Sequence, residues 1–171
     1  MMFHVKPKTA SHVAKGFAVI LLLILQSCIG ARATVQIPDY LLLPNGKEHL
    51  GGKPLTGFVF ENNVRAKLPI EQFIAYKYKS ANYFEREIWV TIDGERYQLI
   101  IYDAADFEKY FNSANFSPMN EEAKDERNST RKFVAISMIT DYNEDCLSDQ
   151  SLLQNKSVKY LRDLKNEYIN Q

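Results

Sequence analysis

Apolar and polar residues alternate most clearly in the middle of the chain. Apolar side chains occupy every second position over 88–92 and again over 97–101, as expected of strands with one buried face. Asp93-Gly94 separates the two runs. This dipeptide favours a type I′ turn, because both central residues of that turn have positive φ. The pattern therefore predicts an antiparallel β-hairpin over about residues 88–102.

Two other stretches have the composition of strands. Phe58 and Phe60 share one side of a short candidate strand at 56–61. The stretch 132–140 is largely apolar on both of its faces. Such a strand is usually central in its sheet, because both of its faces are then covered.

Helical spacing of apolar residues occurs three times. Pro69 begins a helix over 69–79, where its missing N–H costs nothing. Asp103 can cap a short helix after the hairpin, and the hydroxyl of Ser157 can cap a C-terminal helix. Together these elements predict an α+β fold. We expect a small antiparallel sheet of about four strands with a central Asp-Gly hairpin and helices packed on one face.

The stretch before the first of these strands is dense in proline and glycine, which argues against a helix or a long strand. We interpret 28–56 as a tether and 57–171 as a single α+β domain. The four adjacent apolar residues at 40–43 are expected to dock on the domain, because such a group rarely stays in water.

The N-terminal stretch has the layout of a secretory leader. Three lysines precede an apolar run over 17–25, which Gln26 and Ser27 interrupt. The run is too short for a membrane-spanning helix, which needs roughly 20 apolar residues. We therefore expect residues 1–27 to be a signal peptide.

Leu25-Gln26-Ser27-Cys28 resembles the lipobox of bacterial lipoproteins, although Gln26 stands where that family usually has a small or aliphatic residue. The resemblance implies a lipid on Cys28, which would be the first residue of the mature chain. With Ile29 next, it also implies a place at the outer membrane, facing the periplasm. Two alternatives remain open: cleavage after Ala33, which would release a soluble secreted or periplasmic protein, or an uncleaved short anchor.

Charge argues against one class of partner. The whole chain has 21 basic and 21 acidic residues, and removal of residues 1–27 takes away three lysines and no acid. The mature chain then has 18 basic residues against 21 acidic ones, a net charge of about −3. Nucleic-acid binding is disfavoured, because such domains have a basic surplus.

The usual catalytic and metal-binding side chains are scarce. After the leader, His49 is the only histidine, and Cys146 has no cysteine partner once Cys28 is lipidated or removed. A Ser-His or Cys-His device and a zinc site are therefore not expected, and no cofactor is predicted. The acidic stretch from Asp141 imitates the start of a calcium loop, but Cys146 replaces the required glycine and Leu152 the bidentate glutamate.

The remaining chemistry lies in acids and aromatics near the hairpin. Paired acids at the hairpin ends leave an envelope hydrolase as one alternative, and exposed aromatics leave a glycan-binding module as another. The preferred interpretation is a non-catalytic envelope lipoprotein whose domain binds another protein. It would serve as an accessory of an envelope or secretion machine, or as an inhibitor or immunity protein against a toxin or hydrolase. Mixed aromatic and basic surfaces suit protein recognition. The candidate partner-binding residues are Trp89, Thr91, Gln98, Tyr102, Tyr76, Lys77 and Lys79.

Overall fold

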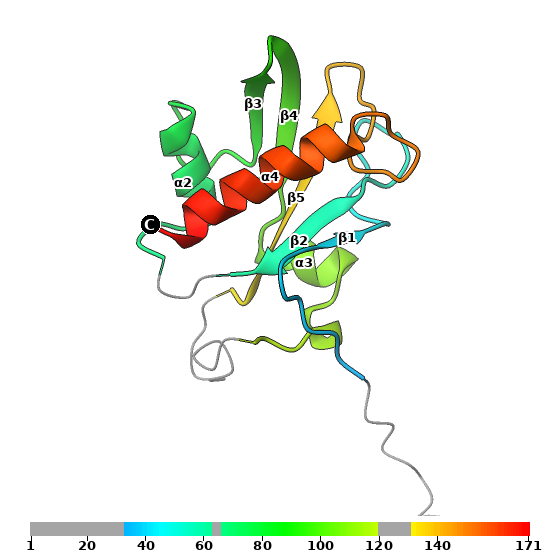
Figure 1. Ribbon diagram of the computed structural model, residues 1–171, viewed down its shortest axis with the longest axis vertical. Coiled ribbons are helices and arrows are strands. Elements are labelled where there is room, and N and C mark those ends of the chain that lie inside the picture. The colour runs from blue at the N-terminus through cyan, green and yellow to red at the C-terminus, as the bar shows by residue number, and fades with distance from the viewer. Residues whose placement is uncertain (1–32, 63–65, 120–130) are drawn as a thin grey trace, which may run out of the picture. The chain divides into compact units, whose positions relative to one another are not determined.

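A five-stranded antiparallel sheet forms the centre of the molecule (Figure 1). The computed structural model describes residues 33–62, 66–119 and 131–171, so the leader motif, Cys28 and the charged run 121–127 lie outside the described residues. The strand order is β1-β2-β5-β4-β3. The strands are β1 (Leu41–Leu43), β2 (Gly57–Glu61), β3 (Glu87–Ile92), β4 (Glu95–Ile101) and β5 (Phe133–Thr140). The helices are α2 (Ile70–Lys77), α3 (Ala104–Tyr110) and α4 (Gln154–Ile169), with a 3-10 turn, η1 (Ser113–Asn115). The predicted α+β class is confirmed, with five strands where about four were expected.

Strand β5 is buried along its whole length. It lies between β2 and β4 and is antiparallel to both. Its central place explains why both of its faces are apolar, as the sequence predicted.

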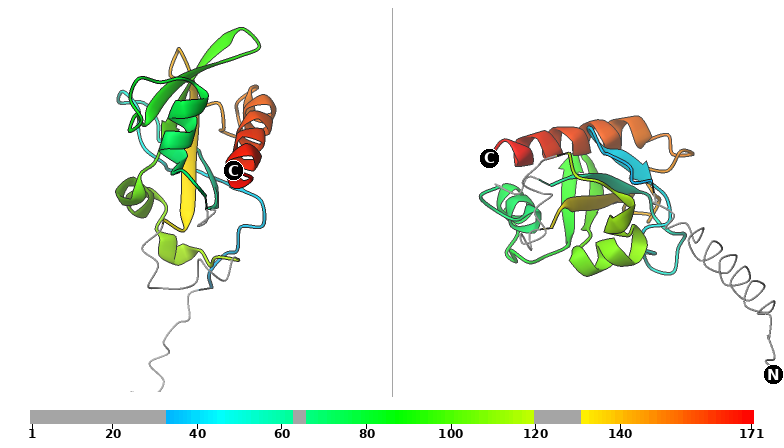
Figure 2. Two further views of the ribbon diagram at one scale, coloured as in Figure 1. Left: turned by 90° about the vertical axis from the view of Figure 1, so that its left-hand side faces the viewer. Right: turned by 90° about the horizontal axis from the view of Figure 1, so that it is seen from below.

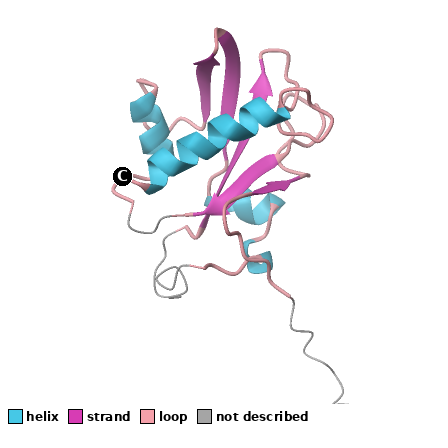
Figure 3. Cartoon of the chain, viewed as in Figure 1, coloured by secondary structure: helices cyan, strands magenta, loops and turns pink. Residues whose placement is uncertain are grey.

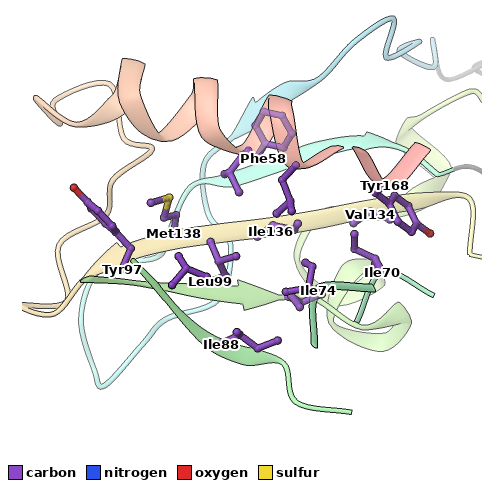
Figure 4. Close-up of a cluster of buried hydrophobic side chains, with 14 of the residues drawn as sticks. Phe58, Ile70, Ile74, Ile88, Tyr97, Leu99, Val134, Ile136, Met138 and Tyr168 are labelled. Atoms are coloured by element: carbon purple, nitrogen blue, oxygen red, sulfur yellow. The ribbon is translucent and has the colours of Figure 1, made fainter. Parts of the chain in front are cut away.

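One face of the sheet is covered by α2 and α4. Figure 4 shows the buried side chains between these helices and the strands, including Leu99 and Ile136 from the sheet and Ile74 from α2. Helix α4 contributes Leu161, and its Tyr168 packs against Phe60 with ring centroids 6.4 Å apart. This face holds the larger of the hydrophobic clusters.

Helix α3 packs on the opposite face (Figure 2). Its Phe107, and Phe111 at its C-terminal end, join Val59 and Ala135, whose positions in the strands alternate with those of the first cluster. The prediction that all helices cover one face is therefore wrong for α3. The second face is apolar at β2 and β5, and it needs a cover of its own.

The hairpin and the first two helices follow their sequence signals. Asp93 and Gly94 both have positive φ, of 54° and 85°, as a type I′ turn requires. Helix α2 begins directly after Pro69. The carboxylate of Asp103 caps α3 by accepting a hydrogen bond from the Asp106 N–H at 2.7 Å.

Folded structure extends well before residue 57. Strand β1 pairs with β2, and Ile37 and Leu55 are buried. The N–H of Val35 donates to the carbonyl of Asn115 at 2.9 Å, and the Val35 carbonyl accepts from Ser117 at 3.0 Å. From Thr34 onward, the segment interpreted as a tether is thus part of the folded unit, which spans Thr34–Gln171. The bonds that hold it come from distant parts of the chain, so local proline and glycine content does not reveal them.

Helix α4 begins earlier than predicted, at Gln154. Ser157, the predicted cap, lies inside the helix and is fully buried. The N-cap position is Leu153, which makes no side-chain cap bond, and its N–H donates to the Ser151 hydroxyl at 3.2 Å.

Candidate partner-binding surface on the β3–β4 hairpin

The two sides of the hairpin differ in cover. Ile88 and Val90 point toward the cluster under α2 and α4 and are buried. Trp89 and Thr91 alternate with them and therefore lie on the other side, where both are exposed. This outer side comprises Glu87, Trp89, Thr91, Arg96 and Gln98, and we call it the open hairpin face.

An aromatic and cationic pair dominates the open hairpin face. The guanidinium of Arg96 lies over the indole of Trp89, 4.7 Å from the ring centroid. Trp89 keeps 43 % of its surface exposed despite this contact. Among the described residues Arg96 has no carboxylate partner. Its positive charge is therefore available to a ligand.

The polar neighbours of this pair are less accessible. Gln98 lies opposite Trp89 in the strand register, and only 8 % of it is exposed. Its side-chain amide donates a long hydrogen bond of 3.5 Å to the Glu87 carboxylate. Gln98 thus forms the floor of the face, and direct contact with a partner is left mainly to Trp89, Thr91 and Arg96.

Tyr102 does not belong to this surface, although alternation places it on the same side of the sheet. It is fully buried, and its ring packs against Tyr110 and Phe111 at centroid distances of 6.0 and 5.2 Å. Burial raises the pKa of its hydroxyl. The prediction that Tyr102 contacts a partner is wrong, because α3 and the segment before β2 cover this side chain.

A chain of hydrogen bonds fixes the Tyr102 hydroxyl. It accepts from the Lys47 N–H at 2.9 Å and lies 2.8 Å from the Ser137 hydroxyl. Ser137 donates to the Thr56 carbonyl at 2.8 Å, so Tyr102 must be the donor to Ser137. The chain approaches closely here, because a Cβ on Gly46 would lie 2.4 Å from the Tyr102 hydroxyl oxygen. This network fastens the segment before β2 to the sheet.

The candidates on and after α2 lie away from the open hairpin face. The ammonium of Lys77 forms an ion pair with Glu167 of α4, on the opposite face of the sheet. Tyr76 is 71 % exposed, and Lys79 is exposed just after the helix with a positive φ of 53°. The seven residues predicted as candidates therefore do not form one surface.

Sequence reasoning missed Arg96, although a signal was present. With a two-residue turn at Asp93-Gly94, Thr91 must oppose Arg96, and this places Arg96 diagonally beside Trp89. It also missed Tyr83 and Phe84, which are exposed in the segment leading into β3, Phe84 to 77 %. Two adjacent aromatics between polar residues were the available signal there.

Two acidic residues from the stretches considered for catalysis or calcium binding, Asp103 and Asp145, make structural hydrogen bonds. The Asp106 N–H caps α3 by donating to the Asp103 carboxylate, and this bond lowers the pKa of the Asp103 carboxyl. The Arg86 guanidinium, which forms an ion pair with Asp103, also lowers that pKa. Asp145, in the stretch that imitates a calcium loop, accepts from the N–H groups of Thr56 and Leu147 at 2.8 and 2.9 Å. Within the described ranges no three His, Cys, Asp or Glu side chains are grouped to hold a metal ion.

Cys146 is fully buried rather than placed on the acidic loop surface. Burial raises the pKa of its thiol from 9.0 to about 12. The nearby Ser157 hydroxyl opposes this shift, and the carboxylates of Asp145 and Glu144 reinforce it. The thiol therefore stays protonated in the folded protein at neutral pH, which disfavours a nucleophilic role.

Over the part of the chain that the structure describes, no helix has the length and apolar character needed to cross a bilayer. Comparisons with protein-family models, with curated proteins and with solved structures gave no match for this chain.

Proposed function

We propose that this chain is a lipid-anchored protein of the bacterial cell envelope whose domain binds another protein through the open hairpin face. The observation that carries the proposal is the exposed pair of Trp89 and Arg96 on the hairpin, with the Arg96 guanidinium 4.7 Å from the centroid of the Trp89 ring. The role is a binding role, as an accessory of an envelope machine or as an inhibitor of a toxin or hydrolase.

The chemistry of the pair supports protein recognition. Tryptophan and arginine are the residue types most enriched among those that dominate binding energy in protein interfaces. Burial of the exposed part of Trp89 by a partner would remove apolar surface from water. An acid on the partner could pair with the Arg96 guanidinium, which has no carboxylate partner in the described part of the chain. The contact between Arg96 and Trp89 restricts both side chains before binding, which lowers the entropic cost of association.

The leader supports the anchor. The stretch Leu25-Gln26-Ser27-Cys28 matches the lipobox pattern at the leucine, the small residue and the cysteine. Stable attachment to a bilayer requires more than one acyl chain, and a lipoprotein cysteine with several chains supplies that. Ile29 after Cys28 favours the outer membrane by the usual sorting pattern of this family.

Cross-linking of the anchored protein in native envelopes tests the binding role. We expect Trp89→Ala to lose a cross-linked partner that the unchanged protein captures, because the indole is the centre of the proposed contact. Tyr76→Ala is the matched control, since Tyr76 is an exposed aromatic outside the open hairpin face, and it should leave capture intact. Equal capture by all three proteins would contradict the proposal, as would turnover of a cell-wall glycan by the purified protein.

The anchor is tested separately. A Cys28→Ala protein should leave the membrane fraction and lose the mass of the lipid. Retention of Cys28→Ala in the membrane fraction with an unprocessed leader would favour the uncleaved anchor instead. A soluble unchanged protein beginning at Thr34 would favour secretion after Ala33.

A further inference from the structure

We propose that the outer edge of β3 is a strand-addition site that binds an extended, acidic segment of the partner protein as a sixth strand of the sheet. This inference rests on the proposed binding function and names its mode. Strand addition uses backbone hydrogen bonds for affinity and alternate side chains for specificity.

The hydrogen-bond phase of the hairpin determines which backbone groups face outward. The carbonyl of Arg86 accepts from the Ile101 N–H at 2.7 Å, so this pair is hydrogen-bonded. In an antiparallel ladder, hydrogen-bonded and non-bonded pairs alternate. The next bonded pairs toward the turn therefore use Ile88, Val90 and Ile92. The N–H and C=O groups of Glu87, Trp89 and Thr91 point away from β4.

These outward groups have no partner in the described part of the chain. The contacts of Glu87, Trp89 and Thr91 include no backbone hydrogen bond outside β3 and β4. β3 is the last strand of the sheet, and its register with β4 runs without a bulge from Glu87 to Ile92. Proline, lysine and bulges are the usual devices that protect a sheet edge, and β3 has none of them.

The opposite edge of the sheet differs. β1 has only three residues, and Pro44 follows it directly. Short edge strands ended by proline are poor templates for a further strand. The β1 edge is therefore protected against a further strand, whereas the β3 edge is open to one.

The side chains beside the β3 edge indicate the chemistry of the partner. An added strand would place alternate side chains next to Trp89, on the side where the Arg96 guanidinium has no carboxylate partner among the described residues. An aspartate or glutamate at that position gains a charge-assisted contact. A second copy of this chain fits less well, because antiparallel pairing of β3 with itself around Trp89 would place the other Trp89, and no acid, at the position opposite the indole.

Hydrogen exchange on the free protein tests the geometry first. The amides of Glu87, Trp89 and Thr91 should exchange fast, while those of Ile88, Val90 and Ile92 should be protected by their bonds to β4. Protection of all six amides in the free monomer would mean that another segment already covers the edge, and would overturn the proposal.

Peptide binding tests the site itself. The probe is acetyl-Thr-Val-Asp-Val-Thr-Val-amide, and its counterpart has lysine in place of aspartate. Trp89 is the only tryptophan, so its emission reports on this site alone. The acidic peptide should shift the emission saturably and protect the Trp89 and Thr91 amides, and the lysine peptide should bind about tenfold more weakly. No saturable shift with the acidic peptide at millimolar concentration would overturn the proposal.

A matched pair of variants isolates the backbone contribution. Thr91→Pro removes an outward N–H without removing a bond to β4, a position that edge strands tolerate. Thr91→Val keeps that N–H. With both variants folded by circular dichroism, Thr91→Pro should bind the acidic peptide about tenfold more weakly, and Thr91→Val should bind within about twofold of the unchanged protein. Equal binding by the two variants would overturn strand addition.

The same pair separates this inference from the proposed function. Envelope capture that is lost with Trp89→Ala but equal for Thr91→Pro and Thr91→Val would leave protein binding standing and overturn strand addition. Capture unaffected by all three variants would contradict the proposed function as well. Self-association of the unchanged protein in sedimentation, lost with Thr91→Pro, would replace the acidic partner with a second copy.

Discussion

One side of the sheet has two parts with the same alternation of side chains, and one part is covered whereas the other is exposed. Around Tyr102 it is covered by α3 and by the segment before β2, and the tyrosine hydroxyl lies in a chain of hydrogen bonds. Around Trp89, toward the end of the hairpin, it is open, and an arginine lies over the indole. Both aromatics come from the same hairpin, and alternation puts both on the same side.

The difference shows that distant segments decide whether a side is core or surface. Tyr102 is buried because Lys47, Gly46 and Thr56 come close to it from a segment far away in the sequence. No described segment extends far enough along the sheet to do the same for Trp89. The open part is therefore available for binding, whereas the covered part stabilises the fold.

The largest expected difference between the two parts is in stability. Tyr102→Ala should lower the free energy of unfolding by about 3–5 kcal/mol, because it leaves a cavity under α3 and removes two hydrogen bonds. Trp89→Ala should cost about 1 kcal/mol or less, as expected of a partly exposed side chain. Denaturant unfolding followed by circular dichroism measures both. Similar costs at the two sites would break the comparison.

Close packing around Gly46 in the covered part predicts a loss of stability smaller than that of Tyr102→Ala. Gly46→Ala should cost about 1–3 kcal/mol, because its Cβ would lie 2.4 Å from the Tyr102 hydroxyl oxygen and 2.7 Å from the Leu55 carbonyl oxygen. The cost should shrink in a Tyr102→Phe background, where the first of these atoms is gone. A double-mutant cycle measures this coupling, and strictly additive costs would show that the two positions do not touch.

The core on the other side of the sheet is a third environment. The buried Cys146 thiol makes the stability of this core depend on pH. Its thiol has a pKa of about 12 in the folded protein against an ordinary value of 9.0, so above pH 9 the unfolded chain loses a proton that the native one keeps. The stability that this thiol contributes is present in full below pH 9. It should fall by up to about 1.4 kcal/mol per pH unit between pH 9 and 12.

The comparison that isolates this effect uses Cys146→Ala. That variant should be less stable than the unchanged protein at neutral pH, because it leaves a cavity, and the gap should narrow as the pH rises toward 12. Urea unfolding of both proteins at a series of pH values measures the gap. A constant gap over this range would mean that Cys146 is not shielded from water.

The smallest effect is expected in the open part. Arg96→Ala removes the cation over Trp89 and should cost about 0.5–1 kcal/mol. The emission of Trp89 should change at the same time, since its environment loses the guanidinium. Thr91→Ser, beside the pair but without a part in it, should leave the emission unchanged.

Much of the fold follows from local pattern. The turn residues of the hairpin, Pro69 before α2, the Asp103 cap and the apolar faces of β5 each have a short-range physical cause, and each element lies where that cause places it. Periodicity and capping act within a few residues, so one sequence is enough to detect them.

What could not be predicted depends on pairing across long distances. Val35 pairs beside Phe116, and Leu55 packs with Ile100 and Ile139, so the proline- and glycine-rich stretch is structured by partners that its own composition does not indicate. The same limit applies to the candidate surface. Trp89 and Thr91 could be placed on the correct side by alternation, but only the distant segments show that Tyr102 on that side is covered.

In the proposed anchored protein, the backbone bonds of Val35 to the 115–117 segment limit the length of chain between the lipid and the folded unit. Only six residue steps separate Cys28 from Thr34, where the folded unit begins, and each step spans at most about 3.3–3.6 Å. If Cys28 carries the proposed lipid, Thr34 would lie within about 20 Å of the bilayer surface. The β3–β4 hairpin and the first described segment, blue in Figure 1, lie at opposite ends of the folded unit, and Figure 3 gives the same view. Under the proposed anchoring, a partner would have to reach the same membrane in order to bind.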